Sequence, residues 1–277
     1  MIRALALVLL LPGAALADPA QRIVSIGGSV TEIAAALGAA DRLIARDTTS
    51  TWPPQITGLP DVGYIRALSA EGVLALGPDM IVSEAGAGPR EAVEVLRAAG
   101  VPFVEMPGDP SPAGVLAKID AVAKALELEP AGAALRAKVA AGLAEAEARA
   151  AALTLPRKRV LFVLALQSGR VTAGGEGSSA EGIIHLAGGV NAAEGFRGYK
   201  QMTDEAVIAA APDVILMMDR EGDLAVLNAD ILAHPALGQT PAAKAGAMVR
   251  MDGMKLLGFG PRTPAAAAEL YAALYGG

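Results

Sequence analysis

The chain contains two similar stretches that lie 134 residues apart. Residues 68–82 are LSAEGVLALGPDMIV and residues 202–216 are MTDEAVIAAAPDVIL, so 203 − 69 and 212 − 78 both equal 134. Each copy predicts a helix capped by Ser69 or Thr203, a break at a Pro-Asp pair, and then a buried strand. A repeat of this length indicates one duplicated domain rather than an array of short units. Two related lobes enclose a cleft, and such clefts bind ligands.

The first 17 residues have the pattern of a secretory signal peptide. Arg3 gives a basic start, an apolar run follows, and Ala15-Leu16-Ala17 forms a cleavage site of small residues. The apolar run is too short to span a bilayer, and no cysteine follows it that would carry a lipid. We therefore expect a protein exported to the periplasm, and not an integral membrane protein.

Composition excludes several classes of function. The net charge of −6 argues against a nucleic-acid groove. The absence of cysteine excludes disulfides, thiolate metal sites and a cysteine nucleophile. Stability must therefore come from burial of a hydrophobic core, for which this chain length suffices in two domains.

Strands alternate with helices in both halves, which predicts an α/β fold with parallel sheets. After the signal peptide we predict an N-terminal lobe at 18–128, a connecting helix at 129–155 and a C-terminal lobe at 156–277. The run from 133 to 153 contains one glycine and no proline, and a helix of that length spans about 32 Å. The expected architecture is two Rossmann-like lobes joined by a long rigid helix, with the ligand cleft between them.

A tyrosine precedes the repeated helix in each lobe. Tyr64 stands five residues before Ser69, and Tyr199 stands four before Thr203. Loops at this position of an α/β lobe line the ligand crevice, and a tyrosine phenolate can hold haem iron. Arg66 would stabilise a phenolate at Tyr64. The alternative is that each ring packs within its loop and its hydroxyl meets the backbone.

The stretch at 63–72, GYIRALSAEG, resembles the haem-binding branch of the periplasmic binding proteins of ABC importers. The wider group includes vitamin B12- and ferric-siderophore-binding proteins, and the likeness runs from about Arg22 to the C-terminus. The resemblance implies that Tyr64 is the axial iron ligand, that haem b is the transported ligand, and that the partner is a permease dimer. We expect the protein itself to be a monomer.

The chain departs from the resembled family in one loop. Some relatives carry a histidine after the first strand of lobe two, whereas this chain has Gln167 and Arg170 in that loop. This difference favours one five-coordinate haem on Tyr64 over two stacked haems. The remaining pocket candidates are Arg66, Arg170 and Lys200 for the haem propionates, Tyr199, and Met254 against the macrocycle. For each cation, a solvated surface charge is an open alternative.

Glu71 and Glu205 occupy matching positions of the two repeated helices. In the resembled family, one acidic residue per lobe meets arginines of the permease, so the resemblance implies docking roles for both. The alternative is an acid in the first helical turn, favoured by the helix dipole. Neither histidine is a predicted ligand: we expect His185 to pack within its helix and His234 to be a surface cap.

The sequence leaves three rival functions to consider. An enzyme is disfavoured because the Gly175-x-Gly177-x-x-Ala180 pattern lacks the acidic residue that a dinucleotide site needs, and no hydrolase or metalloprotease motif occurs. A binding protein for a ferric siderophore or for cobalamin is the closer rival, because it would share the fold. An exported structural or adhesive protein would have no use for a deep interlobe cleft.

Overall fold

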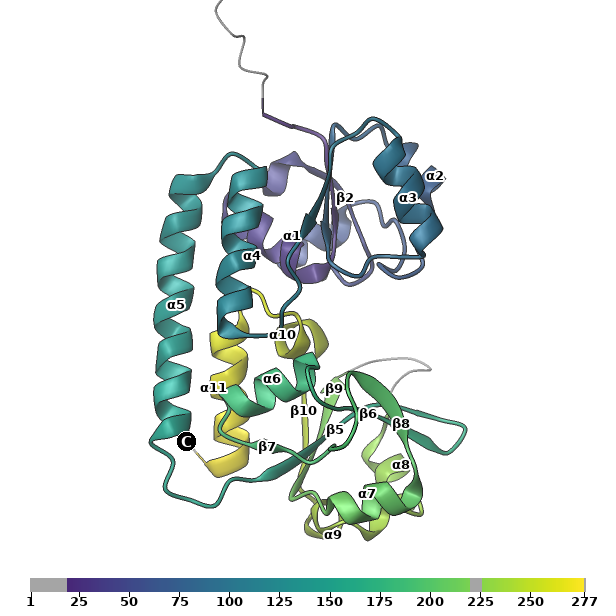
Figure 1. Cartoon of the computed structure of the whole chain (residues 1–277), viewed down its shortest axis with the longest axis vertical. Helices are drawn as coiled ribbons and strands as arrows, with labels where there is room; N and C mark the ends of the chain where they lie inside the picture. The colour runs from purple at the N-terminus through teal and green to yellow at the C-terminus, as the bar shows by residue number, and fades with distance from the viewer. Residues whose placement is uncertain (1–18, 220–225, 277) are drawn as a thin grey trace, which may run out of the picture.

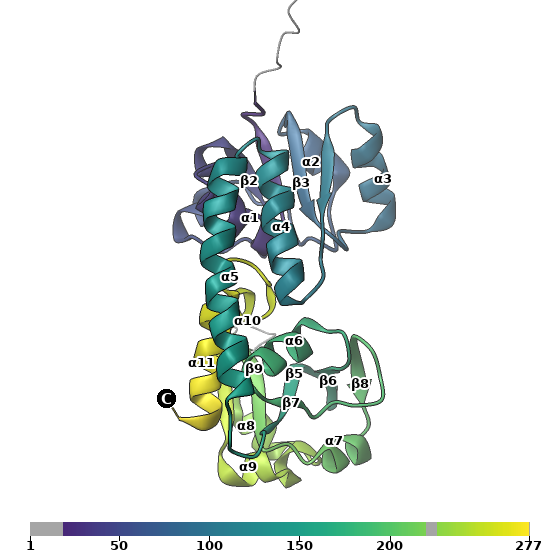
Figure 2. The same cartoon turned by 60° about the vertical axis from the view of Figure 1, so that its left-hand side comes forward.

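The structure, a computed structural model, describes residues 19–219 and 226–276. Two α/β lobes lie one above the other, and a long helix, α5 (Glu129–Ala151), runs beside both (Figures 1 and 2). The predicted signal peptide lies outside the described residues. None of the helices within 19–219 and 226–276 is both long enough and apolar enough to cross a membrane.

The N-terminal lobe is a parallel sheet covered on both faces by helices. Its strands lie in the order β2-β1-β3-β4. Alternate residues of β1 face opposite sides, so Ile23 packs with α1 and α4, whereas Val24 packs with α2 and α3. The elements are β1 (Ile23–Ile26), α1 (Gly28–Ala36), η1 (Ala40–Arg42), β2 (Leu43–Arg46), η2 (Pro54–Gly58), α2 (Ala70–Leu74), β3 (Met80–Glu84), α3 (Arg90–Ala98), β4 (Phe103–Met106) and α4 (Pro112–Ala125).

The C-terminal lobe has a mixed sheet in the order β10-β9-β5-β6-β8, with the short β7 beside β5. Phe162 faces α6 and α11, while Leu161 faces α7, α8 and α9. The elements are β5 (Arg159–Gln167), β6 (Arg170–Gly174), α6 (Ser179–Leu186), β7 (Val190–Asn191), β8 (Tyr199–Met202), α7 (Asp204–Ala210), β9 (Val214–Asp219), α8 (Asn228–Ala233), η4 (Leu237–Gln239), α9 (Pro241–Ala245), β10 (Met248–Asp252), α10 (Gly253–Leu257) and α11 (Thr263–Tyr275).

The duplication is visible in the topology and in the helix caps. The parallel strands β1, β3 and β4 are neighbours in the first lobe, as β5, β9 and β10 are in the second. Ser69 Oγ accepts the N–H of Gly72, and Thr203 Oγ1 accepts the N–H of Ala206, both at 3.2 Å. These contacts confirm the predicted caps and the two-lobed α/β fold.

The repeated Pro-Asp pair has a structural role that the sequence pattern did not reveal. Asp79 accepts the N–H of Arg22 at 3.0 Å, and Asp213 accepts the N–H of Arg159 at 2.8 Å. Each aspartate stands just before its own strand and accepts the backbone N–H of the arginine that begins or directly precedes the neighbouring strand. In return, the arginine side chain donates from Nε to a carbonyl at the end of the repeated helix, Gly77 or Ala210. The motif therefore fixes strand register in both lobes.

The C-terminal lobe departs from the first at one side of its sheet. β5 continues to Gln167 and turns into an antiparallel hairpin with β6. β8 then pairs antiparallel with β6. Only the β5, β9 and β10 part of this sheet is parallel, because a hairpin of this kind reverses the chain without a crossover helix.

The left-handed residue before each proline gives a stability test of the duplication. Gly77 has φ +61°, and its counterpart Ala211 has φ +40°. An L-residue with a Cβ is strained in this region. We expect Ala211→Gly to raise the free energy of unfolding by about 0.5–1 kcal/mol, since relief of strain exceeds the added chain entropy. Urea denaturation followed by circular dichroism measures the change.

The reciprocal substitution is the control. Gly77→Ala should lower the free energy of unfolding by about 1 kcal/mol, because it introduces the same strain in the other lobe. Both positions are exposed, so packing changes contribute little. Negligible effects of both substitutions would show that the left-handed conformation costs little free energy at either turn.

Candidate functional site

Tyr64 lies at the start of a tight turn whose core is a buried isoleucine. The N–H of Ala67 donates to the carbonyl of Tyr64 at 2.7 Å, which closes the turn. Ile65 is 8% exposed and packs in the core beneath α2 and β3. Because Ile65 points inward, Tyr64 and Arg66 on either side of it are both exposed. The turn therefore exposes both the phenol of Tyr64 and the guanidinium of Arg66.

Backbone hydrogen bonds hold this turn to two neighbouring loops. Thr48 donates its N–H to the carbonyl of Gly63 at 3.0 Å, and Gly88 donates to the carbonyl of Ile65 at 2.9 Å. Leu68 in turn donates to the carbonyl of Gly88 at 2.8 Å. Residues 48 and 88 follow strands β2 and β3, so the turn lies at the carboxyl ends of the strands, where α/β sheets bind ligands.

Tyr64 is the more accessible of the two predicted tyrosines. Its side chain is 46% exposed. Within the described part of the chain, neither its hydroxyl nor the guanidinium of Arg66 takes part in a side-chain hydrogen bond or ion pair. A ligand that approaches from the C-terminal lobe therefore meets an accessible oxygen on a fixed backbone.

Tyr199, its counterpart, is placed differently. Its ring packs edge-on against Phe162, with ring centroids 6.2 Å apart, and burial raises the pKa of its hydroxyl above the usual value. Hydrogen bonds to the backbone of Ala180 and to the serines that begin α6 act in the opposite direction and lower it. The alternative weighed for Tyr199, a packed ring with its hydroxyl at the backbone, describes this geometry.

Gln167 and Arg170 flank the turn of the β5–β6 hairpin, and both are exposed. Ser168 and Gly169 between them have φ +50° and +72°, as a two-residue hairpin turn requires. The guanidinium of Arg170 donates to Oε1 of Gln201 on β8 at 3.1 Å. Arg170 is therefore held along the sheet by a neighbour, in contrast to Arg66.

Met254, on α10, has its terminal methyl at the junction of the lobes. A Cβ placed on Gly28 would lie 2.5 Å from that methyl, and one placed on Gly258 would lie 3.1 Å from it. The methyl therefore fills space between the start of α1 and the end of α10. The tip of this side chain packs between protein segments, as in an ordinary core-filling methionine.

Two buried polar groups beneath the cleft were missed from the sequence. The carboxylate of Asp47 is fully buried and accepts hydrogen bonds from the backbone of Gly27 and Thr49 and from the hydroxyls of Thr49 and Ser50. Lys118 is 1% exposed. Its ammonium donates to Ser29 Oγ at 2.9 Å, Glu84 Oε1 at 2.6 Å and the carbonyl of Gly258 at 3.3 Å. No local pattern marks Lys118, because its partners come from distant segments. Asp47 binds its near neighbours Thr49 and Ser50 as well as the distant Gly27, so part of its pattern was present in the sequence.

Glu71 and Glu205 are both exposed in the first turns of α2 and α7. Hydrogen bonds from its own backbone N–H and from the Thr203 hydroxyl lower the pKa of Glu205. The two carboxylates lie on separate lobes at equivalent positions of the duplicated helix. A partner that contacts both must therefore extend across the two lobes.

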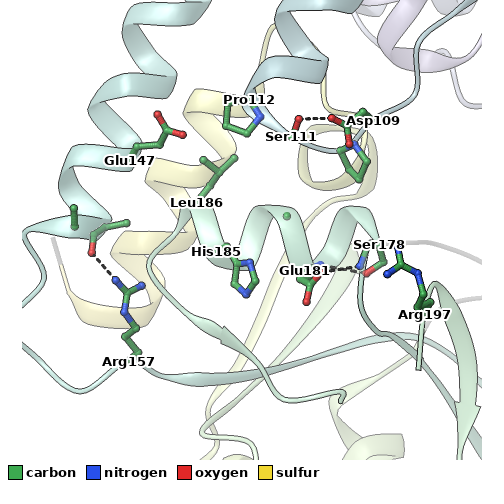
Figure 3. Close-up of a pocket in the computed structure, with 15 residues that line it drawn as sticks. Asp109, Ser111, Pro112, Glu147, Arg157, Ser178, Glu181, His185, Leu186 and Arg197 are labelled. Carbon is green, nitrogen blue, oxygen red and sulfur yellow. Dashed lines mark hydrogen bonds between the residues drawn. The ribbon is translucent and has the colours of Figure 1, made fainter. Parts of the chain in front are cut away.

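The two histidines correct the sequence-based predictions. His185 does not pack within its helix: it is exposed on α6. Figure 3 shows it beside a cavity of about 590 Å³ that also meets Glu147 and Asp109. His234 does cap the end of α8, but it is buried, at 8% exposure, rather than at the surface. Its Nδ1 accepts the N–H groups of Ala236 and Leu237, because these donors begin the next short helix.

The chain belongs to the periplasmic binding protein family, whose sequence profile matches residues 23–253. Two solved structures are similar over nearly the whole fold. The "Periplasmic heme-binding protein BhuT in complex with two hemes" is 41% identical with a TM-score of 0.86, and covers 91% of this chain and 97% of its own. The "Periplasmic heme-binding protein RhuT from Roseiflexus sp. RS-1" is 37% identical with a TM-score of 0.86, and covers 92% and 98%.

Curated relatives are more distant. The "Vitamin B12-binding protein" of Vibrio campbellii is 29% identical over 226 residues, which cover 79% of each chain. An ABC transporter substrate-binding lipoprotein of Bacillus subtilis, YvrC, is 24% identical over 201 residues, and the matched part spans 64% of its length. The family and these neighbours are solute-binding proteins and not enzymes, which confirms the prediction from motifs.

The buried carboxylate of Asp47 gives a test of how the cleft floor is held. Asp47→Asn puts an amide NH₂ among donors, so some of them lose their acceptor in a buried setting. We expect the free energy of unfolding to fall by about 2–4 kcal/mol, measured by urea denaturation. Asp41→Asn, at an exposed position, is the matched control and should change it by less than about 0.5 kcal/mol. Equal losses would remove the special role of Asp47.

Proposed function

We propose that this protein binds haem b in the periplasm and delivers it to the permease dimer of an ABC-type importer. The observation that carries the proposal is the turn at Tyr64, in which the side chains of Tyr64 and Arg66, two residues apart, are both exposed. Similarity to two heme-binding proteins, at 41% and 37% identity, supports it. The residues at 1–17 serve as the cleaved export signal in this proposal.

The chemistry of the turn suits ferric iron. A phenolate is a hard anionic ligand, and an unperturbed tyrosine has a pKa near 10, so ionisation at neutral pH needs nearby positive charge. The bound iron and Arg66 supply it. Among the described residues, no group of three or more His, Asp or Glu side chains is placed to hold a metal ion. Iron that is already chelated by a porphyrin needs one axial ligand from the protein, which Tyr64 provides.

The remaining pocket residues take secondary roles in this proposal. Arg66 and Arg170 are exposed cations that can pair with the propionates. Gln167 is exposed at the hairpin turn, where a polar side chain can meet a propionate or water. The hydroxyl of Tyr199 and the methyl of Met254 contact other protein groups. In this proposal, these two side chains therefore form part of the wall and floor of the cleft.

The visible spectrum tests the iron ligand. With hemin added to purified protein, we expect a Soret band and a charge-transfer band typical of a phenolate ligand. Tyr64→Phe should abolish that signature and weaken haem binding by about 100-fold, because the only axial bond from the protein is lost. Absorbance titration and resonance Raman spectroscopy measure both effects.

Tyr271→Phe is the matched control, because this tyrosine lies on α11 and packs beside Tyr275. It should leave the spectrum unchanged.

The end point of the same titration should fall at one haem per chain, as the loop at Gln167 and Arg170 favours. An end point at two haems per chain would match the description of BhuT and overturn the single-haem expectation. If the protein bound cyanocobalamin or a ferric siderophore tightly and did not bind haem, the proposed ligand would be wrong and the rival ligand would replace it.

We further propose that Glu71 and Glu205 contact arginines of the permease. The two carboxylates lie at equivalent positions of the two lobes and are both exposed, so each lobe would meet one half of a dimer. Charges placed in this way act mainly on orientation and encounter rate.

Charge reversal tests the docking sites. Glu71→Arg with Glu205→Arg should reduce haem uptake by the cognate permease in proteoliposomes by about tenfold or more, because attraction becomes repulsion. Haem binding by the free protein should not change. Glu91→Arg with Glu145→Arg, at exposed positions on α3 and α5, makes the same change in net charge and should leave uptake intact. Equal uptake by both double variants would exclude the docking role.

A further inference from the structure

The two lobes touch through glycines that leave no room for a side chain. One such contact joins Gly182 on α6 to the loop before α4. A Cβ placed on Gly182 would lie 2.5 Å from the carbonyl oxygen of Pro110 and 2.7 Å from the ring of Phe259. Figure 3 shows the neighbouring side chains at this junction, with Asp109 and Ser111 above α6 and Glu181 on it. The loop before α4 of the N-terminal lobe therefore packs directly against the backbone of α6.

Helix α6 itself does not require glycine at this position. Residue 182 lies inside the helix Ser179–Leu186 and is not among the glycines with positive φ. Alanine is a better helix former than glycine by about 1 kcal/mol. The need for glycine therefore comes from the neighbouring lobe, and in particular from a backbone oxygen that cannot rotate away.

A second set of contacts holds the lobes together at the segment between α10 and α11. A Cβ on Gly260 would lie 3.3 Å from Cβ of Ser29. Lys118 of the N-terminal lobe donates to the carbonyl of Gly258, and Arg262 forms an ion pair with Glu32 on α1. The segment 258–262 is therefore bound to the N-terminal lobe on both sides of Gly260.

We propose that Gly182 is a positioning residue that sets the spacing of the two lobes. Because Gly182 allows close contact with Pro110, it keeps the gap between the C-terminal lobe and the Tyr64 turn narrow enough to hold a thin, flat ligand. This inference rests on the proposed function, because haem is such a ligand. Iron ligation belongs to the N-terminal lobe alone, whereas the tightness of the opposite wall depends on Gly182.

Gly182→Ala tests the proposal. The added methyl group must push Pro110 away, so the lobes separate and haem binding weakens by about tenfold. The phenolate signature of Tyr64 in the visible spectrum persists, since the turn and its supports lie within the other lobe. A variant that merely unfolded would lose that signature. The lobe spacing is measured by electron-spin distance between labels on Glu91→Cys and Lys244→Cys, which are the only cysteines in the chain; the distance should increase in Gly182→Ala.

Gly58→Ala is the matched control, because no atom lies within 4 Å of its added Cβ and its φ is not positive. It should change neither the distance nor the affinity. Gly260→Ala, with its milder contact, should give an intermediate effect on both and decides the question if Gly182→Ala does not fold. An unchanged distance, or unchanged haem affinity in a protein that binds haem, overturns the inference. Failure of the native protein to bind haem overturns the proposed function instead, while the distance measurement still tests the spacing.

Discussion

The ammonium group of Lys118 is the interaction on which the arrangement of the cleft depends. A buried ammonium without partners costs several kcal/mol, so its three acceptors must stay in place together. They belong to the start of α1, the end of β3 and the segment after α10. One buried charge therefore holds together the start of α1, the end of β3 and the segment after α10. The position of the Tyr64 turn follows, because residue 88, four positions beyond Glu84, binds that turn through its backbone.

Lobe rigidity consequently has a second source besides the long helix. The sequence predicted a strut from the composition of residues 133–153, and α5 is found at Glu129–Ala151. The helix alone would still allow the lobes to rotate about its ends. The contacts of the segment 253–262 with Gly28, Ser29 and Glu32 of the first lobe constrain that rotation on the other side. Because α5 and the segment 253–262 both connect the two lobes, the lobes resist bending and twisting relative to each other.

What the sequence could predict was local. The caps at Ser69 and Thr203, the alternation of strands and helices, and the accessible Tyr64 all depend on neighbours within about one helical turn or strand. Lys118 and the burial of His234 were not predicted, because they depend on partners distant in the chain, residue 258 for Lys118 and residue 169 for His234. Asp47 was missed although Thr49 and Ser50 lie close to it in the sequence, because its burial depends on the packed fold. The environment of Tyr199 was left open for the same reason: its ring rests on Phe162 from another strand. Burial is a property of the assembled fold.

The duplication produced equal scaffolds but unequal cleft edges. The Pro-Asp pairs fix the strands in both lobes with the same hydrogen bonds. In the first lobe the tyrosine precedes a buried isoleucine in a tight turn, which forces the phenol outward. In the second lobe the tyrosine begins a strand, and its ring is drawn into the sheet. Of these two tyrosines, Tyr64 is therefore the one that presents an accessible phenol. In the proposed function, haem can bind to the first lobe before the second lobe contributes, and opening of the lobes by the permease would expose the ligand while leaving its iron bond as the last contact to break.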